Sequence, residues 1–140
     1  MTGPSRVRAI LLAAFAAAAC GAQSTERPTG PKLGENVLVR IDSAVRLPAD
    51  TTTVRFTQVT SDSRCPSGAQ CVWSGEATIV LTVGGTQQVT LRLAPGSPES
   101  TAVVGMFKIS FVDLAPYPQV EKPRAKGGYV ATLRFDSAAP

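Results

Sequence analysis

The stretch ATIVLTVGGTQQVTLRL, residues 77–93, contains two alternating apolar runs separated by a pair of glycines. Apolar residues recur at every second position before the pair, and again after it, at Ala77, Ile79, Leu81, Val83, Val89, Leu91 and Leu93. A period of two is typical of a half-buried β-strand. Glycine accepts the positive φ of tight hairpin turns, so Gly84 and Gly85 predict a two-residue turn between paired strands.

The same alternation recurs on both sides of this hairpin. Further runs lie at residues 37–41, 54–57, 107–111 and 129–135, and loops rich in Pro and Gly separate them at residues 47–50, 95–98 and 115–118. No helical stripe follows the N-terminal region. We therefore expect one all-β domain over residues 35–137, an immunoglobulin-like β-sandwich of about seven short strands, with a small β-barrel as the alternative.

One strand breaks the pattern. Val54 and Phe56 fall on one face, but Val59 falls on the other. The sequence predicts either a β-bulge near Gln58 or a strand with both faces partly covered.

The N-terminal residues have the pattern of an export signal that is not part of this domain. Arg6 and Arg8 precede an uncharged, alanine-rich run of about 11 residues, which is too short to span a bilayer of about 30 Å. Small residues and then Cys20 follow, as in a lipobox. We predict a signal peptide at 1–19 and a lipid on Cys20; plain secretion and a cytosolic protein are the alternatives.

Residues 20–34 would then be the lipidated cysteine and a flexible tether, because they hold almost no large apolar side chains. Removing residues 1–19 also removes Arg6 and Arg8, which lowers the formal net charge from +4 to +2. This balance argues against nucleic-acid binding. The expected location is the bacterial cell envelope, anchored to the outer membrane or to the extracytoplasmic face of the cell membrane.

Residue types that carry catalysis are scarce. The 140-residue chain has no histidine, the commonest general base and metal ligand in proteins. Two thiolates do not complete a zinc site, and no clustered acidic pattern suits calcium. Asp62, Glu76 and Asp113 are the carboxylates with a chance of converging at strand ends. We expect no enzyme activity, no metal and no cofactor.

The stretch SRCPSGAQCVWSG, residues 63–75, is the most distinctive. If Cys20 carries lipid, Cys65 and Cys71 remain as an even pair, and we predict a structural disulfide between them. A redox role is disfavoured because the spacing is not C-x-x-C. Alternation places Trp73 on the same face as Cys71, which favours packing in the core; an exposed aromatic anchor is the alternative.

These residues, from D-S-R-C-P at 62–66 to Q-C-V-W-S-G at 70–75, resemble a family of uncharacterised bacterial lipoproteins. The resemblance covers about residues 35–136 and implies an exported, anchored, all-β domain without a known activity. We expect a non-catalytic binding or structural module at the membrane surface, contacting an envelope protein or glycan through Arg64, Gln70 and Trp73. The alternative is a protease inhibitor that presents loop 65–71, with Arg64 or Gln70 in a specificity pocket.

Overall fold

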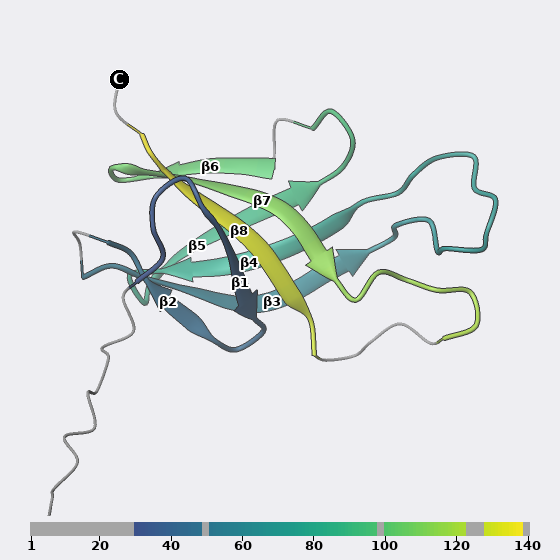
Figure 1. Cartoon of the computed structure of the whole chain (residues 1–140), viewed down its shortest axis with the longest axis horizontal. Coiled ribbons are helices and arrows are strands. Elements are labelled where there is room, and N and C mark those ends of the chain that lie inside the picture. Colours follow the sequence, from purple (N-terminus) through teal and green to yellow (C-terminus); the bar gives the residue numbers. More distant parts are fainter. Residues whose placement is uncertain (1–29, 49–50, 98–99, 123–127, 139–140) are drawn as a thin grey trace, which may run out of the picture.

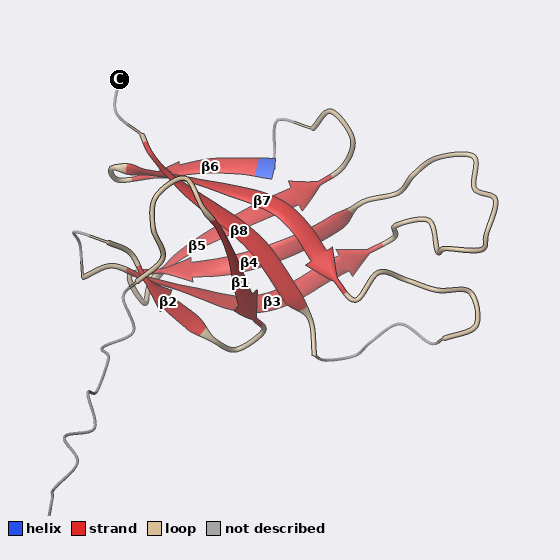
Figure 2. Ribbon diagram, viewed as in Figure 1, coloured by secondary structure: helices blue, strands red, loops and turns tan. Residues whose placement is uncertain are grey.

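The computed structural model describes residues 30–48, 51–97, 100–122 and 128–138. The predicted signal peptide, Cys20 and most of the tether lie outside these residues. The described chain forms strands and no α-helix; the helical mark before β6 in Figure 2 is the single residue Ser100. The strands are β1 (Asn36–Arg40), β2 (Ala44–Arg46), β3 (Thr53–Asp62), β4 (Ala77–Val83), β5 (Gln87–Leu93), β6 (Thr101–Val104), β7 (Phe107–Ala115) and β8 (Val130–Ser137).

The strands form two antiparallel four-stranded sheets, in the orders β1-β8-β7-β6 and β2-β3-β4-β5 (Figure 1). The β-sandwich predicted from the sequence is confirmed, and the sheets do not close into the alternative barrel. Strands β2 to β5 follow one another as hairpins in one sheet. Strands β6 to β8 do the same in the other, where β1 pairs with β8. The alternating runs did not mark the two shortest strands, β2 and β6.

The hydrophobic core lies between the sheets. Every second residue of β4 is buried, and the intervening threonines and valine are half-buried on the outer face. The largest side chains with almost no exposure are Phe56, Phe135, Ile79, Leu81, Leu91, Ile109, Leu114 and Leu133. The period-two pattern therefore predicted which face of each long strand turns inward.

The break in the alternating pattern of β3 is caused by a β-bulge. Phe56 pairs with Leu81 and Gln58 pairs with Val80, so Thr57 is an extra residue in the ladder. The Thr57 hydroxyl donates to the Val80 carbonyl at 2.9 Å. The extra residue returns Val59 to the inner face, where it packs against the core. The predicted bulge is confirmed, one residue before Gln58.

The β4–β5 turn is longer by one residue than the sequence predicts. Val83 pairs with Gln87, which leaves three residues between the strands. Gly84 and Gly85 have φ of 59° and 81°, and the Thr86 amide donates to the Val83 carbonyl at 3.3 Å. Both glycines therefore supply the positive φ expected of them, and Thr86 is the added residue.

Strand direction separates two ends of the sandwich. At one end, the Gly34 amide donates to the Phe135 carbonyl and the Ala138 amide donates to the Met106 carbonyl. The chain thus enters and leaves the domain at this end, which we call the entry end. At the other, here called the loop end, lie residues 63–76, 94–97 and 116–122 (Figure 1, right). The site described next is built at the loop end.

Candidate functional site

A buried ion pair organises the loop end. Asp62 is the last residue of β3, and Arg64 follows it after one residue. The Arg64 Nε lies 2.8 Å from Asp62 Oδ1, and its Nη2 lies 2.9 Å from Oδ2, which is a two-point contact. The two side chains are 6% and 5% exposed. The planar guanidinium suits this geometry, since its donors form a rigid fork that matches a carboxylate.

The same guanidinium binds the end of β7 and the loop that follows it. Arg64 Nη1 donates to the Leu114 carbonyl, and Nη2 donates to the Pro116 carbonyl at 3.1 Å. The Tyr117 ring centroid lies 4.8 Å from the guanidinium carbon, a cation–π contact. The Tyr129 hydroxyl, just before β8, donates to Asp62 Oδ2 at 3.4 Å. The Asp62–Arg64 pair at the end of β3 thus contacts two segments of the other sheet: Arg64 contacts residues 114–117, and Asp62 contacts Tyr129.

Burial alone would lower the pKa of Arg64, but the hydrogen bond and negative charge of Asp62 outweigh it and raise that pKa above its ordinary value. The guanidinium therefore stays charged, and Asp62 balances its charge locally. This corrects one sequence expectation: Arg64 is 5% exposed, so it cannot enter a specificity pocket of another protein without breaking this network.

Cys65 and Cys71 form the predicted disulfide, with Cα atoms 6.0 Å apart. Below the disulfide, the two arms of the loop continue the β3–β4 ladder. The Ser63 amide donates to the Glu76 carbonyl at 2.8 Å, and the Cys65 amide donates to the Ser74 carbonyl at 2.9 Å. The disulfide therefore closes a loop whose stem is already hydrogen-bonded.

Gly75 permits this close approach of the two arms. Its φ is 73°, and a Cβ atom placed on it would lie 2.0 Å from the Ser63 carbonyl oxygen. A side chain at this position would force the stem apart, so the W-x-G spacing in the sequence has a steric reason.

The disulfide loop also contacts the β7–β8 connection directly. The Ser67 amide donates to the Pro118 carbonyl at 2.9 Å, and the Val120 amide donates to the Ser67 carbonyl at 3.3 Å. Ser67 and Gln119 consequently form an isolated parallel bridge. The two loops are held together both at Arg64, inside, and at Ser67, near the surface.

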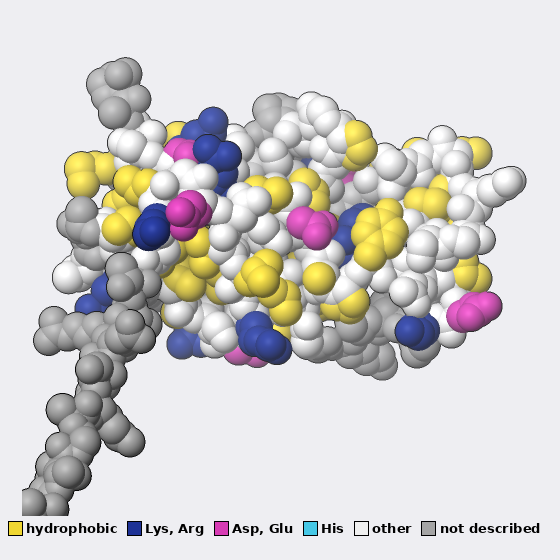
Figure 3. Space-filling view, viewed as in Figure 1, with side chains coloured by type: hydrophobic (Ala, Val, Ile, Leu, Met, Phe, Trp, Pro, Cys, Tyr) yellow, Lys and Arg dark blue, Asp and Glu magenta, His cyan; other side chains and the backbone are white. Residues whose placement is uncertain are grey.

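Several large apolar side chains are exposed to solvent at the loop end. Trp73 is 60% exposed and Val72 is fully exposed, so the predicted core packing of Trp73 is wrong and the exposed alternative holds. Tyr117 and Val120 are 50% and 59% exposed, and Gln70 is exposed as well. Figure 3 shows hydrophobic side chains at the surface of the loop end, among polar atoms and few charges.

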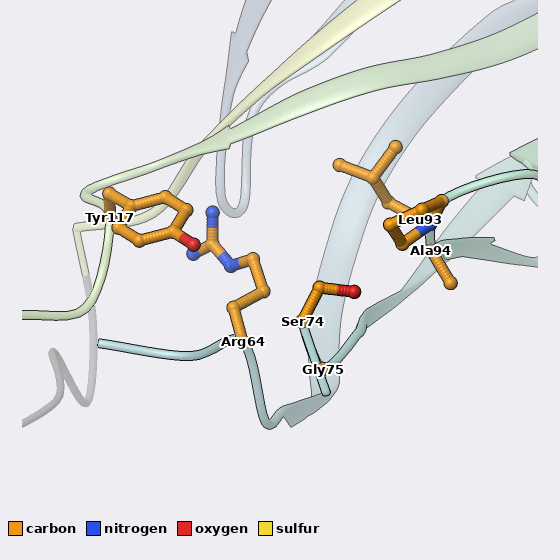
Figure 4. A pocket seen from close by; sticks show the side chains of 7 residues that line it. Arg64, Ser74, Gly75, Leu93, Ala94 and Tyr117 are labelled. Atoms are coloured by element: carbon orange, nitrogen blue, oxygen red, sulfur yellow. The ribbon is translucent and has the colours of Figure 1, made fainter. Parts of the chain in front are cut away.

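A shallow hollow of about 280 Å³ opens where the three loops meet. We call it the Arg64 hollow; it is lined by Arg64, Ser74, Gly75, Leu93, Ala94, Pro95 and Tyr117. In Figure 4, Arg64 and Tyr117 lie on one side, Leu93 and Ala94 on the other, and Ser74 and Gly75 between them. The sequence predicts a loop at 95–98, but nothing in it indicates that Pro95 lines the same hollow as Arg64.

The structure does not bring the three candidate carboxylates together. Asp62 binds Arg64, Glu76 lies 3.4 Å from Arg92 Nη1, and Asp113 is exposed on β7. Within residues 30–48, 51–97, 100–122 and 128–138, no three His, Cys, Asp or Glu side chains gather closely enough to hold a metal ion. In this same part of the chain, no helix has the length and apolarity to cross a membrane.

Neither a protein-family model, nor a curated protein, nor a solved structure matches this chain.

Proposed function

We propose that this protein is an exported, lipid-anchored, non-catalytic binding module of the bacterial envelope, and that its loop end carries the contact surface. The observation that supports this most directly is the exposure of Val72 and Trp73 on a restrained loop. Tryptophan is enriched among residues that dominate binding energy. A restrained loop also loses less conformational entropy on binding.

Export and anchoring are supported by chemistry at two places. The Cys65–Cys71 disulfide is stable in an oxidising compartment. The chain would reach such a compartment if residues 1–19 act as an export signal. Cys20 follows the small residues that precede a lipidation site. More than one acyl chain on this cysteine would provide stable attachment, because a single chain binds membranes only marginally.

The fold supports an orientation for such an anchored domain. The described chain begins at the entry end, and β3, with ten residues, runs from there to the loop end. At a rise of about 3.3 Å per residue, the strand spans about 33 Å. A membrane anchor before residue 30 would therefore hold the entry end nearer to the bilayer and leave Trp73 facing away from it.

Anchoring is tested by fractionation. The full chain and a Cys20→Ser variant are expressed in a bacterial host that processes lipoproteins. We expect the parent in the membrane fraction with acyl chains on Cys20, shown by mass spectrometry, and the variant in the soluble envelope fraction. An unprocessed chain in the cytosol would refute export, and a processed chain without lipid would refute the anchor.

Binding is tested by in-cell crosslinking of the full chain, with Trp73→Ala compared to Val103→Ala. Val103 is 67% exposed on β6, away from the loop end, and is the matched control. We expect Trp73→Ala to lose the crosslinked species and Val103→Ala to keep it. Equal crosslinking of all three chains would refute the loop end as the contact.

A protease inhibitor is the second candidate, because the disulfide-closed loop is exposed. Of the two residues expected to enter a specificity pocket, Gln70 is exposed and Arg64 is buried. A panel of serine and cysteine proteases tests it, and inhibition that Gln70→Ala abolishes is the expected result. Absence of inhibition across the panel would dismiss this candidate.

A further inference from the structure

We infer that the Arg64 hollow accepts one uncharged, apolar side chain from a protein partner. This inference rests on the proposed binding function and deepens it, since it names the kind of partner and the group that enters. It is carried by the lining of the hollow, by its charge and by its size.

The far wall is aliphatic. Leu93 ends β5 with its side chain half-buried against the core, and Ala94 and Pro95 continue the wall into the loop. Arg64 and Tyr117 lie across the hollow from them, with the Arg64 guanidinium nearer than the Tyr117 ring (Figure 4). Pockets that bind ligands are lined mainly by such groups, with few polar atoms to fix orientation. An apolar group placed here is removed from water on several sides.

The charge of the hollow is balanced before any partner arrives. Arg64 is the one charged residue among those that line it, and Asp62 contacts its guanidinium at 2.8 and 2.9 Å. A carboxylate or phosphate entering the hollow would lose its hydration and compete with Asp62 for the same cation. A cation would meet the positive guanidinium directly. An uncharged group is therefore the complementary one.

A sugar fits less well than an apolar side chain. Its hydroxyl groups would need hydrogen-bonding partners in place of water, and a buried hydroxyl without one is costly. Of the side chains that line the hollow, Ser74 and Tyr117 have hydroxyl groups, and the wall formed by Leu93, Ala94 and Pro95 offers no polar side chain. Because one wall is aliphatic and few hydrogen-bond donors line the hollow, a hydrocarbon group fits it better than a sugar.

Size and surroundings point to a protein. The hollow has a volume of about 280 Å³, just below the range of about 300–1,000 Å³ for pockets that hold a whole small molecule. It is large enough for one side chain. Trp73 adjoins Ser74, a lining residue, in the chain, and both Trp73 and Val72 are exposed. Protein interfaces combine such a central apolar anchor with a surrounding rim.

The test uses the purified full chain, held in nanodiscs if it is lipidated, and a phage-displayed random peptide library with empty nanodiscs for counter-selection. Selected peptides are synthesised and their affinities measured. The variant Ala94→Trp fills the hollow, and Thr86→Trp, in the exposed β4–β5 turn, is the matched control. In the parent chain, NMR shifts of the Leu93 methyl groups are compared with those of Val103, which keeps the test valid if Ala94→Trp fails to fold.

We expect the selected peptides to share one uncharged apolar residue, and its change to alanine to weaken binding about tenfold or more. Ala94→Trp should weaken binding similarly, Thr86→Trp should not, and the Leu93 methyl signals should shift. A charged consensus, peptides that leave Leu93 unshifted, or no enrichment would overturn the inference. Binding of N-acetylglucosamine oligomers that Ala94→Trp abolishes would overturn it in favour of a glycan. None of these results depends on the membrane fractionation or on the Trp73 crosslink. Those two experiments therefore test the proposed function independently of this inference.

Discussion

At the scale of single residues, Arg64 shows how a charged side chain becomes structural. Its neighbours Ser63 and Ser67 are exposed, and sequence alone suggests the same for an arginine in a loop. In the fold, its guanidinium is enclosed by Asp62, two carbonyls and the Tyr117 ring. A buried charge is tolerated because each of these groups compensates part of its lost hydration.

Arg64→Met should lower the free energy of unfolding by about 3–5 kcal/mol, because it leaves the Asp62 carboxylate buried without its cation. The pKa of Arg64 is raised above its ordinary value. The stabilising contribution of Arg64 is therefore complete at any pH below that ordinary pKa and is lost only at higher pH. Arg64 should thus contribute fully to the stability of the parent chain at neutral pH. Urea denaturation of the parent and the variant at pH 7 measures the loss.

The double variant Asp62→Asn with Arg64→Met is the control, since it removes both charges. It should be more stable than Arg64→Met alone, by at least about 1 kcal/mol. If the double variant is no more stable, the cost does not come from an isolated carboxylate.

Gly75→Ala should destabilise the protein more than Gly84→Ala. Both glycines have positive φ, which costs an alanine about 1–2 kcal/mol. A Cβ at Gly75 would also lie 2.0 Å from the Ser63 carbonyl oxygen, whereas nothing lies within 4 Å of one at Gly84. Thermal unfolding of the two variants measures the difference, and equal losses would show that the stem has room for a side chain.

At the scale of elements, the loop between β3 and β4 is fastened in four ways. The stem continues the strand ladder, the Cys65–Cys71 disulfide closes the tip, Ser67 bridges to residues 118–120, and Arg64 donates to the carbonyls of Leu114 and Pro116. The strands alone would not orient this loop, because a 14-residue connection can take many paths. Its exposed apolar residues are therefore presented by contacts between loops.

Replacing Cys65 and Cys71 together by serine should cost about 2 kcal/mol, the loop-closure value for the seven residues from Cys65 to Cys71. Hydrogen exchange should increase at residues 67–71 and stay slow at the amides of Ser63 and Glu76, because the stem and Arg64 hold without the disulfide. Fast exchange throughout 63–76 would show that the disulfide, rather than the ion pair, organises the loop.

At the scale of the whole molecule, the two ends of the sandwich differ in composition. Residues 30–35 lie at the entry end, while Trp73, Tyr117 and the Arg64 hollow lie at the loop end. Antiparallel strands enforce this separation, since the β3–β4, β5–β6 and β7–β8 connections all fall at the same end. An anchored domain with this topology would expose its binding surface away from the bilayer.

Trp73, the single tryptophan, reports on this orientation. In vesicles that carry the lipidated chain, headgroup-attached quenchers should leave Trp73 fluorescence nearly unchanged, while soluble acrylamide should quench it readily, as expected for a side chain 60% exposed. A Trp73→Phe, Thr86→Trp variant moves the reporter to the entry end and should be quenched more by the lipids. Strong lipid quenching of Trp73 would show that the loop end lies on the membrane.

Much of the fold follows from local sequence. Alternation of apolar residues, glycine pairs and proline-rich breaks predict the long strands, the inward faces and the bulge in β3, because each depends on the direction of neighbouring side chains. Spacing and the count of cysteines likewise predict the Cys65–Cys71 disulfide. The short strands β2 and β6 escape this reasoning, because three or four residues are too few to show a period.

The site depends on contacts that no local pattern contains. Alternation predicts Trp73 in the core, but Gly75, with a φ of 73°, interrupts the extended backbone between residue 73 and β4, so the period of two does not reach Trp73. Arg64 is buried because Leu114, Pro116 and Tyr117, about fifty residues later, fold over it. The sequence by itself determined which segments become strands and which face of each is apolar, since those properties are local; only the tertiary structure decided which loop residues meet, because that depends on the order of strands in the two sheets.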